Sequence, residues 1–257
     1  MHVSDKGVHG TVKIIFLGTN GWYDSETGNS ICTLIDTQDH YIILDAGNGI
    51  YKADRYIKKD KPVILFLSHF HLDHIEGLHV LAKFKFKKLD IYGQPGTEKV
   101  IADFLGDKFS IPPEKLSYPC KLHDIDTGSH STPVSFKCLE LQHASRCFGY
   151  RFELEGKTIS YCTDTGYCDA AVKLSKDADI LISECALAPG ITTPGWPHMN
   201  PQLAAKLAKE SGAKKLVMTH FDAEQYTRSA QRTAAQSAAR KVFRNSFAAS
   251  DNMLITL

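Results

Sequence analysis

Ser68-His69-Phe70-His71-Leu72-Asp73-His74 directly follows the apolar run VILFL at 63–67. Three imidazoles and one carboxylate fall within six positions, a density that a solvated loop seldom contains. The apolar run is typical of a buried strand, so His69 and His71, alternating with Phe70, are expected to point at one atom. Asp73 and His74 follow a bend, and four ligands from one short loop do not easily reach a single tetrahedral ion. The motif therefore predicts two neighbouring metal ions.

The pattern His-x-His-x-Asp-His resembles the signature of the metallo-β-lactamase superfamily of dinuclear hydrolases. The resemblance implies three further ligands downstream, in the order His, Asp, His. Residues of these types occur in that order after strand-like apolar runs, at His143, Asp164 and His220. The resemblance assigns His69, His71 and His143 to one metal ion, Asp73, His74 and His220 to the other, and Asp164 to a bridge between them.

The ligand set implies the chemistry. Imidazole and carboxylate ligands suit Zn²⁺ first, with Mn²⁺ and Fe as rivals that the sequence does not distinguish. Two ions about 3.5–4 Å apart hold a bridging hydroxide, polarise the scissile group and neutralise charge on the attacked oxygens. Asp73 thus counts among the catalytic residues as well as the ligands. The sequence contains no Gly-x-Ser-x-Gly motif that would supply a serine nucleophile instead.

The composition is that of an ordinary globular chain. Its 257 residues suit one large domain or two small ones, and a hydrophobic content of 43% is enough to fill a sizeable core. With 30 Lys and Arg against 29 Asp and Glu, the net charge of +1 creates no overall field that attracts nucleic acid or anionic lipid. The chain starts without an apolar signal segment and has no stretch of 18 apolar residues, so neither secretion nor membrane spanning is expected.

The seven cysteines are odd in number and form no Cys-x-x-Cys pair. This pattern indicates free thiols in a reducing compartment, and we predict a cytoplasmic protein. Cys162 and Cys185 lie near the candidate ligands in the sequence, but free cysteine is among the most buried residue types, which favours packing over metal binding. The oligomeric state is not fixed by the sequence, and a homodimer stays open.

The apolar pattern predicts an α+β fold, a four-layer αββα sandwich formed by one domain over residues 1–257. Strands are expected at 12–17, 30–35, 41–44, 63–67, 135–141, 148–154, 157–163, 179–183, 215–219 and 252–257. Helices are expected around Ile75, Leu78 and Leu81, between 164 and 178, from Asn200-Pro201 to Gly212, and once more between His220 and the terminal strand. Residues 89–134, rich in Pro, Gly and Lys, are expected to form loops and short helices on the rim.

Three patches resemble the ribonuclease Z branch of the superfamily, phosphodiesterases that trim transfer-RNA 3′ ends. They are Phe16-Leu17-Gly18-Thr19, Phe148-Gly149-Tyr150-Arg151-Phe152 and PHMNPQLAA at 197–205. In that branch, a His just before the helix of the third patch protonates the leaving oxygen, with support from an upstream Glu. His198 and Glu184 occupy the matching places in this sequence. A phosphodiester needs such an acid because its alkoxide leaving group is poor. The alternative is that His198 is an ordinary surface residue.

One departure separates the chain from ribonuclease Z proper, which carries a long RNA-gripping arm between its fourth His ligand and the bridging Asp. Here Asp164 follows His143 by only 21 residues, which leaves no room for the arm. The run KFKFKK at 83–88 could bind single-stranded nucleic acid, but a Lys-rich solvated face is the favoured interpretation. Extended nucleic-acid binding is therefore doubtful.

Two functions stay open. The first is a dinuclear phosphodiesterase acting on a small-molecule or oligonucleotide phosphodiester, such as a cyclic nucleotide or an RNA end. The second is a lactone or carboxylic-ester hydrolase on the same scaffold, in which the attacked carbon is trigonal. His198 and Glu184 favour the first, because only a phosphodiester gives this pair a role. A metal-binding scaffold without activity is least favoured, since every expected ligand is present.

Overall fold

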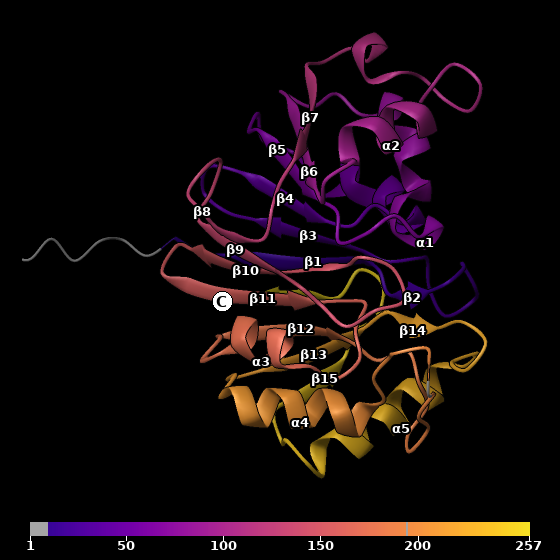
Figure 1. Ribbon diagram of the computed structural model, residues 1–257, viewed down its shortest axis with the longest axis vertical. Coiled ribbons are helices and arrows are strands. Elements are labelled where there is room, and N and C mark those ends of the chain that lie inside the picture. The colour runs from indigo at the N-terminus through magenta and orange to yellow at the C-terminus, as the bar shows by residue number, and fades with distance from the viewer. Residues whose placement is uncertain (1–9, 194) are drawn as a thin grey trace, which may run out of the picture.

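Successive residues of the first strand point to opposite sides of a sheet that is buried on both faces. In β1 (Lys13–Gly18), Ile14 and Phe16 pack into one apolar core, whereas Ile15 and Leu17 pack into another. A sheet that buries both faces needs a layer on each side. In the computed structural model of Figure 1, which describes residues 10–193 and 195–257, a second sheet covers one face and helices cover the other.

The first sheet has the spatial order β16 (Leu254–Thr256), β1, β3 (Cys32–Asp36), β4 (Tyr41–Leu44), β5 (Val63–Phe66), β6 (Leu89–Gly93) and β7 (Cys120–Asp124). The pairs from β16 to β4 are antiparallel, and those from β4 to β7 are parallel. Its outer face is covered by the 3-10 helices η1 (Asn48–Arg55) and η2 (Glu76–Lys83) and by α1 (Leu72–Ile75) and α2 (Thr97–Phe104). A third 3-10 helix, η3 (Pro113–Lys115), precedes β7.

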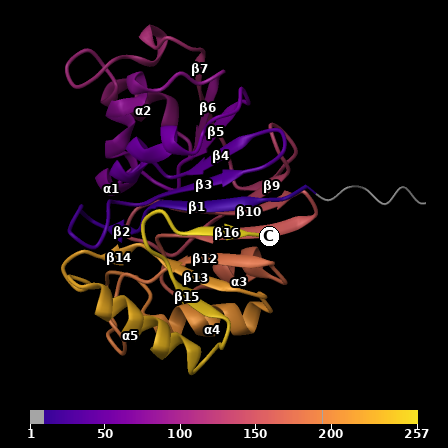
Figure 2. The same cartoon turned by 180° about the vertical axis from the view of Figure 1, so that it is seen from behind.

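The second sheet has the order β15 (Ser246–Ala248), β13 (Leu216–Thr219), β12 (Ile180–Glu184), β11 (Lys157–Cys162), β10 (Phe148–Leu154), β9 (Phe136–Glu140) and β8 (Gly128–His130). The pairs from β15 to β11 are parallel, and those from β11 to β8 are antiparallel. Its outer face carries α3 (Asp169–Ser175), α4 (Pro201–Ser211) and α5 (Ser229–Arg240), seen from behind in Figure 2. The layers are thus helix, sheet, sheet, helix, which confirms the predicted sandwich.

A short parallel pair joins the two halves at one end of the molecule. It consists of β2 (Asn20–Gly21), which follows β1, and β14 (Phe221–Asp222), which follows β13. The residues just before and after these strands are therefore held close together although they belong to different sheets. This end of the sandwich carries the candidate site.

Every strand expected from the sequence forms within two residues of its predicted bounds. The helix start at Asn200-Pro201 is confirmed as well, because the Asn200 side chain accepts a hydrogen bond of 2.9 Å from the Leu203 N–H. Gly212 ends this helix in the left-handed conformation, with φ +74°. The helical pattern around Ile75 is only four α-helical residues followed by the 3-10 helix η2.

The interpretation of residues 89–134 as loops and short helices is wrong in part. The segment contains α2 and η3, but β6 and β7 extend the first sheet and β8 lies at the edge of the second. Four of the five residues of the run LDIYG in β6 are buried, although the run follows four lysines within 83–88. Its strand character comes from parallel pairing with β5, a long-range contact that the local composition does not show.

The 83–88 run is a solvated lysine face over a buried phenylalanine pair, as favoured from the sequence. Phe84 and Phe86 are buried in the core beneath the first sheet's helices and stack on each other. Three of the lysines form ion pairs with aspartates: Lys83 with Asp54, Lys87 with Asp60 and Lys88 with Asp90. The phenylalanine rings are therefore not available to stack on bases.

All seven cysteines are free. Cys162 and Cys185 are buried in the core under α3, α4 and α5, and neither belongs to a group of potential ligands, so the packing interpretation is confirmed. Within the described ranges, no helix has both the length and the apolar character that crossing a bilayer requires. The expectation that the chain lacks a signal segment concerns residues 1–9, which lie outside those ranges.

Candidate metal centre

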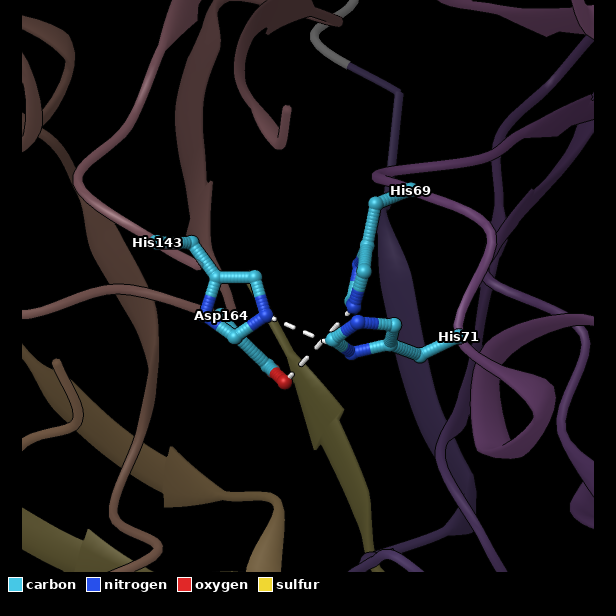
Figure 3. Close-up of side chains that lie close together, drawn as sticks. All are labelled: His69, His71, His143 and Asp164. Atoms are coloured by element: carbon cyan, nitrogen blue, oxygen red, sulfur yellow. Dashed lines mark hydrogen bonds and ion pairs between the residues drawn. The ribbon is translucent and has the colours of Figure 1, made fainter. Parts of the chain in front are cut away.

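The candidate ligands lie where strands of both sheets end at one edge of the sandwich. His69, His71, Asp73 and His74 lie between β5 and the end of α1 in the first half. In the second half, His143 lies in the β9–β10 loop, and Asp164 and His220 follow the parallel strands β11 and β13. Figure 3 shows His69 and His71 facing His143 and Asp164 across the junction. Neither half contains a complete site.

The first group of side chains comprises His69, His71, His143 and Asp164, each with one potential ligand atom within 4.8 Å of the others. His143 Nε2 lies 3.3 Å from His71 Nδ1, and His69 Nε2 lies 3.9 Å from Asp164 Oδ2 (Figure 3). His69 Nε2 is buried and finds no hydrogen-bond partner among the described residues. Burial lowers the pKa of His143 to about 4 and also lowers the pKa of His71, which favours the neutral imidazoles that offer lone pairs.

The second group comprises Asp73, His74 and His220. His220 Nε2 lies 3.1 Å from His74 Nε2 and 3.2 Å from Asp73 Oδ2, and His74 Nε2 lies 3.6 Å from the same oxygen. Ligands at roughly 2.0–2.2 Å from a tetrahedral ion lie roughly 3.3–3.6 Å apart, so these distances fit a cation between the three side chains.

Asp164 faces both groups. Its Oδ2 is the oxygen near His69, whereas its Oδ1 lies 3.2 Å from His220 Nε2 and 3.5 Å from His74 Nε2. Thr163 Oγ1 donates a hydrogen bond of 2.5 Å to Oδ1 and fixes the carboxylate. One carboxylate between two clusters of nitrogen donors is the arrangement that a bridging ligand requires. The residues present therefore fit two divalent ions.

The buried carboxylates make this pocket favourable for positive charge. Burial alone would lower the pKa of His74, but Asp164, Asp45 and Asp73 outweigh it and raise this pKa well above its usual value. Conversely, burial opposes the charge of Asp164, yet His220 and His74 hold its pKa well below the usual range. A bound cation would compensate the same negative charge.

Asp45 supports the candidate ligands through hydrogen bonds, and the sequence analysis did not single it out. Its Oδ2 lies 2.9 Å from His74 Nδ1, and the same carboxylate accepts hydrogen bonds from the Ser68 N–H (2.7 Å) and the Tyr161 hydroxyl (2.6 Å). Such a partner fixes the tautomer and orientation of a ligating imidazole. The only sign of it in the sequence is that an acidic residue directly follows the apolar run of β4. In the structure, β4 runs parallel to β5, the strand that leads to the histidines.

Asp45→Asn is expected to weaken metal binding or turnover by roughly 10–100-fold, because the amide cannot hold His74 in the ligating orientation as an anion does. Metal titration and kcat/KM on the same preparation measure the effect. Asp90→Asn, near the amino end of β6, is the matched control for loss of a buried carboxylate paired with a histidine. Equal effects of the two variants would contradict the role given to Asp45.

His198 and Glu184 form a buried pair beside both groups. His198 Nδ1 lies 2.8 Å from Glu184 Oε1, and Glu184 is held by the backbone N–H groups of Thr165 (2.6 Å) and Met199 (3.1 Å). Burial would lower the pKa of His198, but the charge of Glu184 outweighs it and raises this pKa to about 9. The side chain is 8% exposed, so His198 is not an ordinary surface residue. Glu184 therefore favours the protonated form of His198.

A pocket of about 700 Å³ opens over these side chains. Its wall includes residues of both groups and His198, which therefore face the same space. These residues are His71, Asp73, Asp164, His198 and His220. Its size is in the range of roughly 300–1,000 Å³ that small-molecule sites occupy.

The fold and this site define a hydrolase of the metallo-β-lactamase type. The sequence profile of the β-lactamase superfamily domain matches residues 40–221, and the chain belongs to this family. A protein named ribonuclease Z from Nostoc punctiforme is 27% identical over 275 aligned positions, which cover 82% of this chain and 84% of the relative. The probable metallo-hydrolase YhfI of Bacillus subtilis is 28% identical over 227 positions, which cover 82% and 87%.

Solved structures show the same fold. The crystal structure of YhfI from Bacillus subtilis aligns with a TM-score of 0.78 at 24% identity and covers 96% of this chain and 100% of that one. Human tRNase Z, short form, aligns with a TM-score of 0.71 at 22% identity over 95% and 98% of the two chains. A diphosphatase from the PhnP family aligns with a TM-score of 0.71 at 17% identity over 96% and 97%.

Proposed function

We propose that this protein is a dinuclear metal-dependent phosphodiesterase that hydrolyses a small-molecule or oligonucleotide phosphodiester. The observation that carries the proposal is the pair of His198 and buried Glu184, with Nδ1 2.8 Å from Oε1, beside two groups of His and Asp side chains. Relatives named ribonuclease Z support the same class of reaction. Seven free cysteines suit the reducing cytoplasm, which we propose as its location.

In this mechanism the two groups of side chains would hold two divalent ions, Zn²⁺ first and Mn²⁺ or Fe as rivals. When bound, the ions would supply a nucleophile at neutral pH and neutralise charge on the phosphate. Asp164 and Asp73 fix the spacing of the two groups. His198 donates a proton to the leaving oxygen as the ester bond breaks, because an alkoxide is a poor leaving group. Glu184 orients the imidazole through Nδ1 and keeps it protonated.

A substrate screen tests this proposal. The purified protein, reconstituted with Zn²⁺ or with Mn²⁺, is assayed with bis(4-nitrophenyl) phosphate, 4-nitrophenyl acetate and a γ-lactone. We expect metal-dependent turnover of the phosphodiester far above that of the other two. Turnover of the lactone or acetate alone would replace the proposal by the lactone or carboxylic-ester hydrolase on the same scaffold.

Transfer-RNA precursors are expected to be poor substrates. Residues 143–164, all of them described, form a loop and the β10–β11 hairpin, with no protruding arm. Phosphate contacts from Lys and Arg supply most nucleic-acid affinity and make it steeply salt-dependent, and this chain has a net charge of only +1. A protein that makes many phosphate contacts loses roughly 10³–10⁵-fold in affinity between 50 and 200 mM salt. We expect this protein to bind precursors weakly over that range, and its affinity should fall only slightly as the salt concentration rises. Tight binding with a steep slope would contradict this prediction.

A further inference from the structure

Both tryptophans of this chain line the pocket over the candidate metal centre. They are Trp22 and Trp196, the two tryptophans in the sequence, with 62% and 50% of their surface exposed. Tryptophan is highly buried on average, because its indole ring has a large apolar surface. Two exposed indoles at one pocket therefore indicate a surface that a ligand covers.

Trp22 is fixed at the side of the pocket formed by Asp73 and His220. Its backbone N–H donates a hydrogen bond of 2.8 Å to Asp73 Oδ2. It adopts φ +74°, a left-handed conformation that bulky residues rarely adopt and that clusters at functional sites. The preceding Gly21 lies against the His220 imidazole, where a Cβ would approach the ring to 2.6 Å. The backbone that carries Trp22 is thus held against the second group of ligands.

Trp196 lies beside the first group of ligands, next to His71 and His143. Its ring is nearly parallel to that of His71, with centroids 6.2 Å apart and an interplanar angle of 6°, and it meets His143 edge to face at 5.9 Å. The Thr193 hydroxyl donates a hydrogen bond of 2.6 Å to the Trp196 carbonyl and fixes the turn. The two indoles therefore border the two ligand groups from different sides.

The charged residues of the pocket limit the class of ligand that it can bind. None of the described residues that line it is a lysine or an arginine, whereas Glu76 and Asp222 add negative charge at its wall. A ligand with several phosphates would find no cationic side chain to pair with the extra charges. The pocket fits a ligand whose single anionic group lies at the metal centre and whose remainder is flat and uncharged.

We propose that Trp22 and Trp196 are substrate-binding residues that stack on the base of a nucleoside phosphodiester with a single negative charge. This inference rests on the proposed phosphodiesterase function and names its substrate class. Every base has a π face, and loss of one stacking aromatic typically weakens binding roughly 5- to 150-fold. Phenylalanine at either position retains a ring and keeps most of this contact.

Two esters that share a leaving group and a charge test the inference by kinetics. These are the 4-nitrophenyl esters of thymidine 5′-phosphate and of methyl phosphate, assayed with the zinc-loaded protein. For Trp22→Ala and Trp196→Ala we expect KM for the thymidine ester to rise roughly 5- to 150-fold, with the methyl ester nearly unchanged. Trp22→Phe and Trp196→Phe should restore most of the difference. Phe109→Ala, 74% exposed and outside the pocket, is the matched control for removal of an exposed aromatic ring.

Equal losses on both esters, or no loss on either, would overturn the stacking role while leaving the phosphodiesterase proposal intact. If the wild-type protein hydrolyses neither ester, the proposed function fails, and a binding experiment decides the inference. Because both tryptophans lie at the pocket, intrinsic fluorescence excited at 295 nm reports on it directly. Quenching by cyclic AMP but not by diethyl phosphate supports stacking, and equal responses to these two monoanions contradict it.

Discussion

Asp164→Asn and His220→Ala are each expected to lower turnover by roughly 10³-fold or more while the fold stays intact. Asp164 is the carboxylate that faces both ligand groups, and His220 Nε2 lies within 3.2 Å of two carboxylate oxygens and of His74 Nε2. Loss of Asp164 or of His220 removes one of the side-chain atoms that would hold an ion at the second group. The fold should persist, because three apolar cores between the layers supply most of the burial.

Metal analysis and circular dichroism separate loss of the site from loss of the fold. After reconstitution with Zn²⁺, the wild-type chain should hold two ions, and each variant should hold fewer while keeping a native spectrum and a cooperative melt. Asp179→Asn, whose carboxylate pairs with Lys214 on the same half of the molecule, is the control and should keep both ions and full turnover. Near-normal turnover of His220→Ala with two ions bound would show that the ligand assignment is wrong.

The four layers could be predicted from the apolar runs along the sequence, whereas the full set of residues that meet at the site was predicted from the resemblance to the metallo-β-lactamase signature. Each candidate ligand follows an apolar run, and parallel strands bring such ends together. The role of Asp45 could not be predicted in this way. It depends on β4 lying beside β5, where the Asp45 N–H donates to the Phe66 carbonyl at 2.9 Å and places the carboxylate under His74. Strand neighbours are long-range information that a hydrophobic pattern does not contain.

Long-range contacts also explain why the two tryptophans of the pocket and two strands of the first sheet were not predicted. Trp22 and Trp196 are far apart in the sequence, and nothing near either residue marks it as part of a common wall. Trp22 directly follows β2, so its place beside the second group of ligands depends on the β2–β14 pair that joins the halves. In residues 89–134, β6 and β7 are strands because of their partners, so their lysine-rich and glycine-rich surroundings were misleading.

The second large effect is expected for His198→Ala, and its size should depend on the leaving group. A positioned acid contributes roughly 10²–10⁴-fold when the leaving group is a poor alkoxide and little when it is a good one such as 4-nitrophenolate. The variant should keep both metal ions, lose turnover steeply on a dinucleotide and lose much less on bis(4-nitrophenyl) phosphate. Comparing kcat on the two substrates measures this contrast.

The pH profile tests how Glu184 supports His198. Because the carboxylate raises the pKa of His198 to about 9, the acid form is present below that pH, and turnover of an alkyl ester should fall as the pH rises through it. Glu184→Gln removes the charge but keeps an acceptor near Nδ1, so the pKa should fall towards the ordinary value and the alkaline limb should move to lower pH. His198 would serve binding or structure if His198→Ala lost the same factor in kcat on both substrates and Glu184→Gln left the alkaline limb of the pH profile unchanged. No loss on either substrate would instead favour a lactone or ester hydrolase, in which the leaving oxygen needs no protein acid.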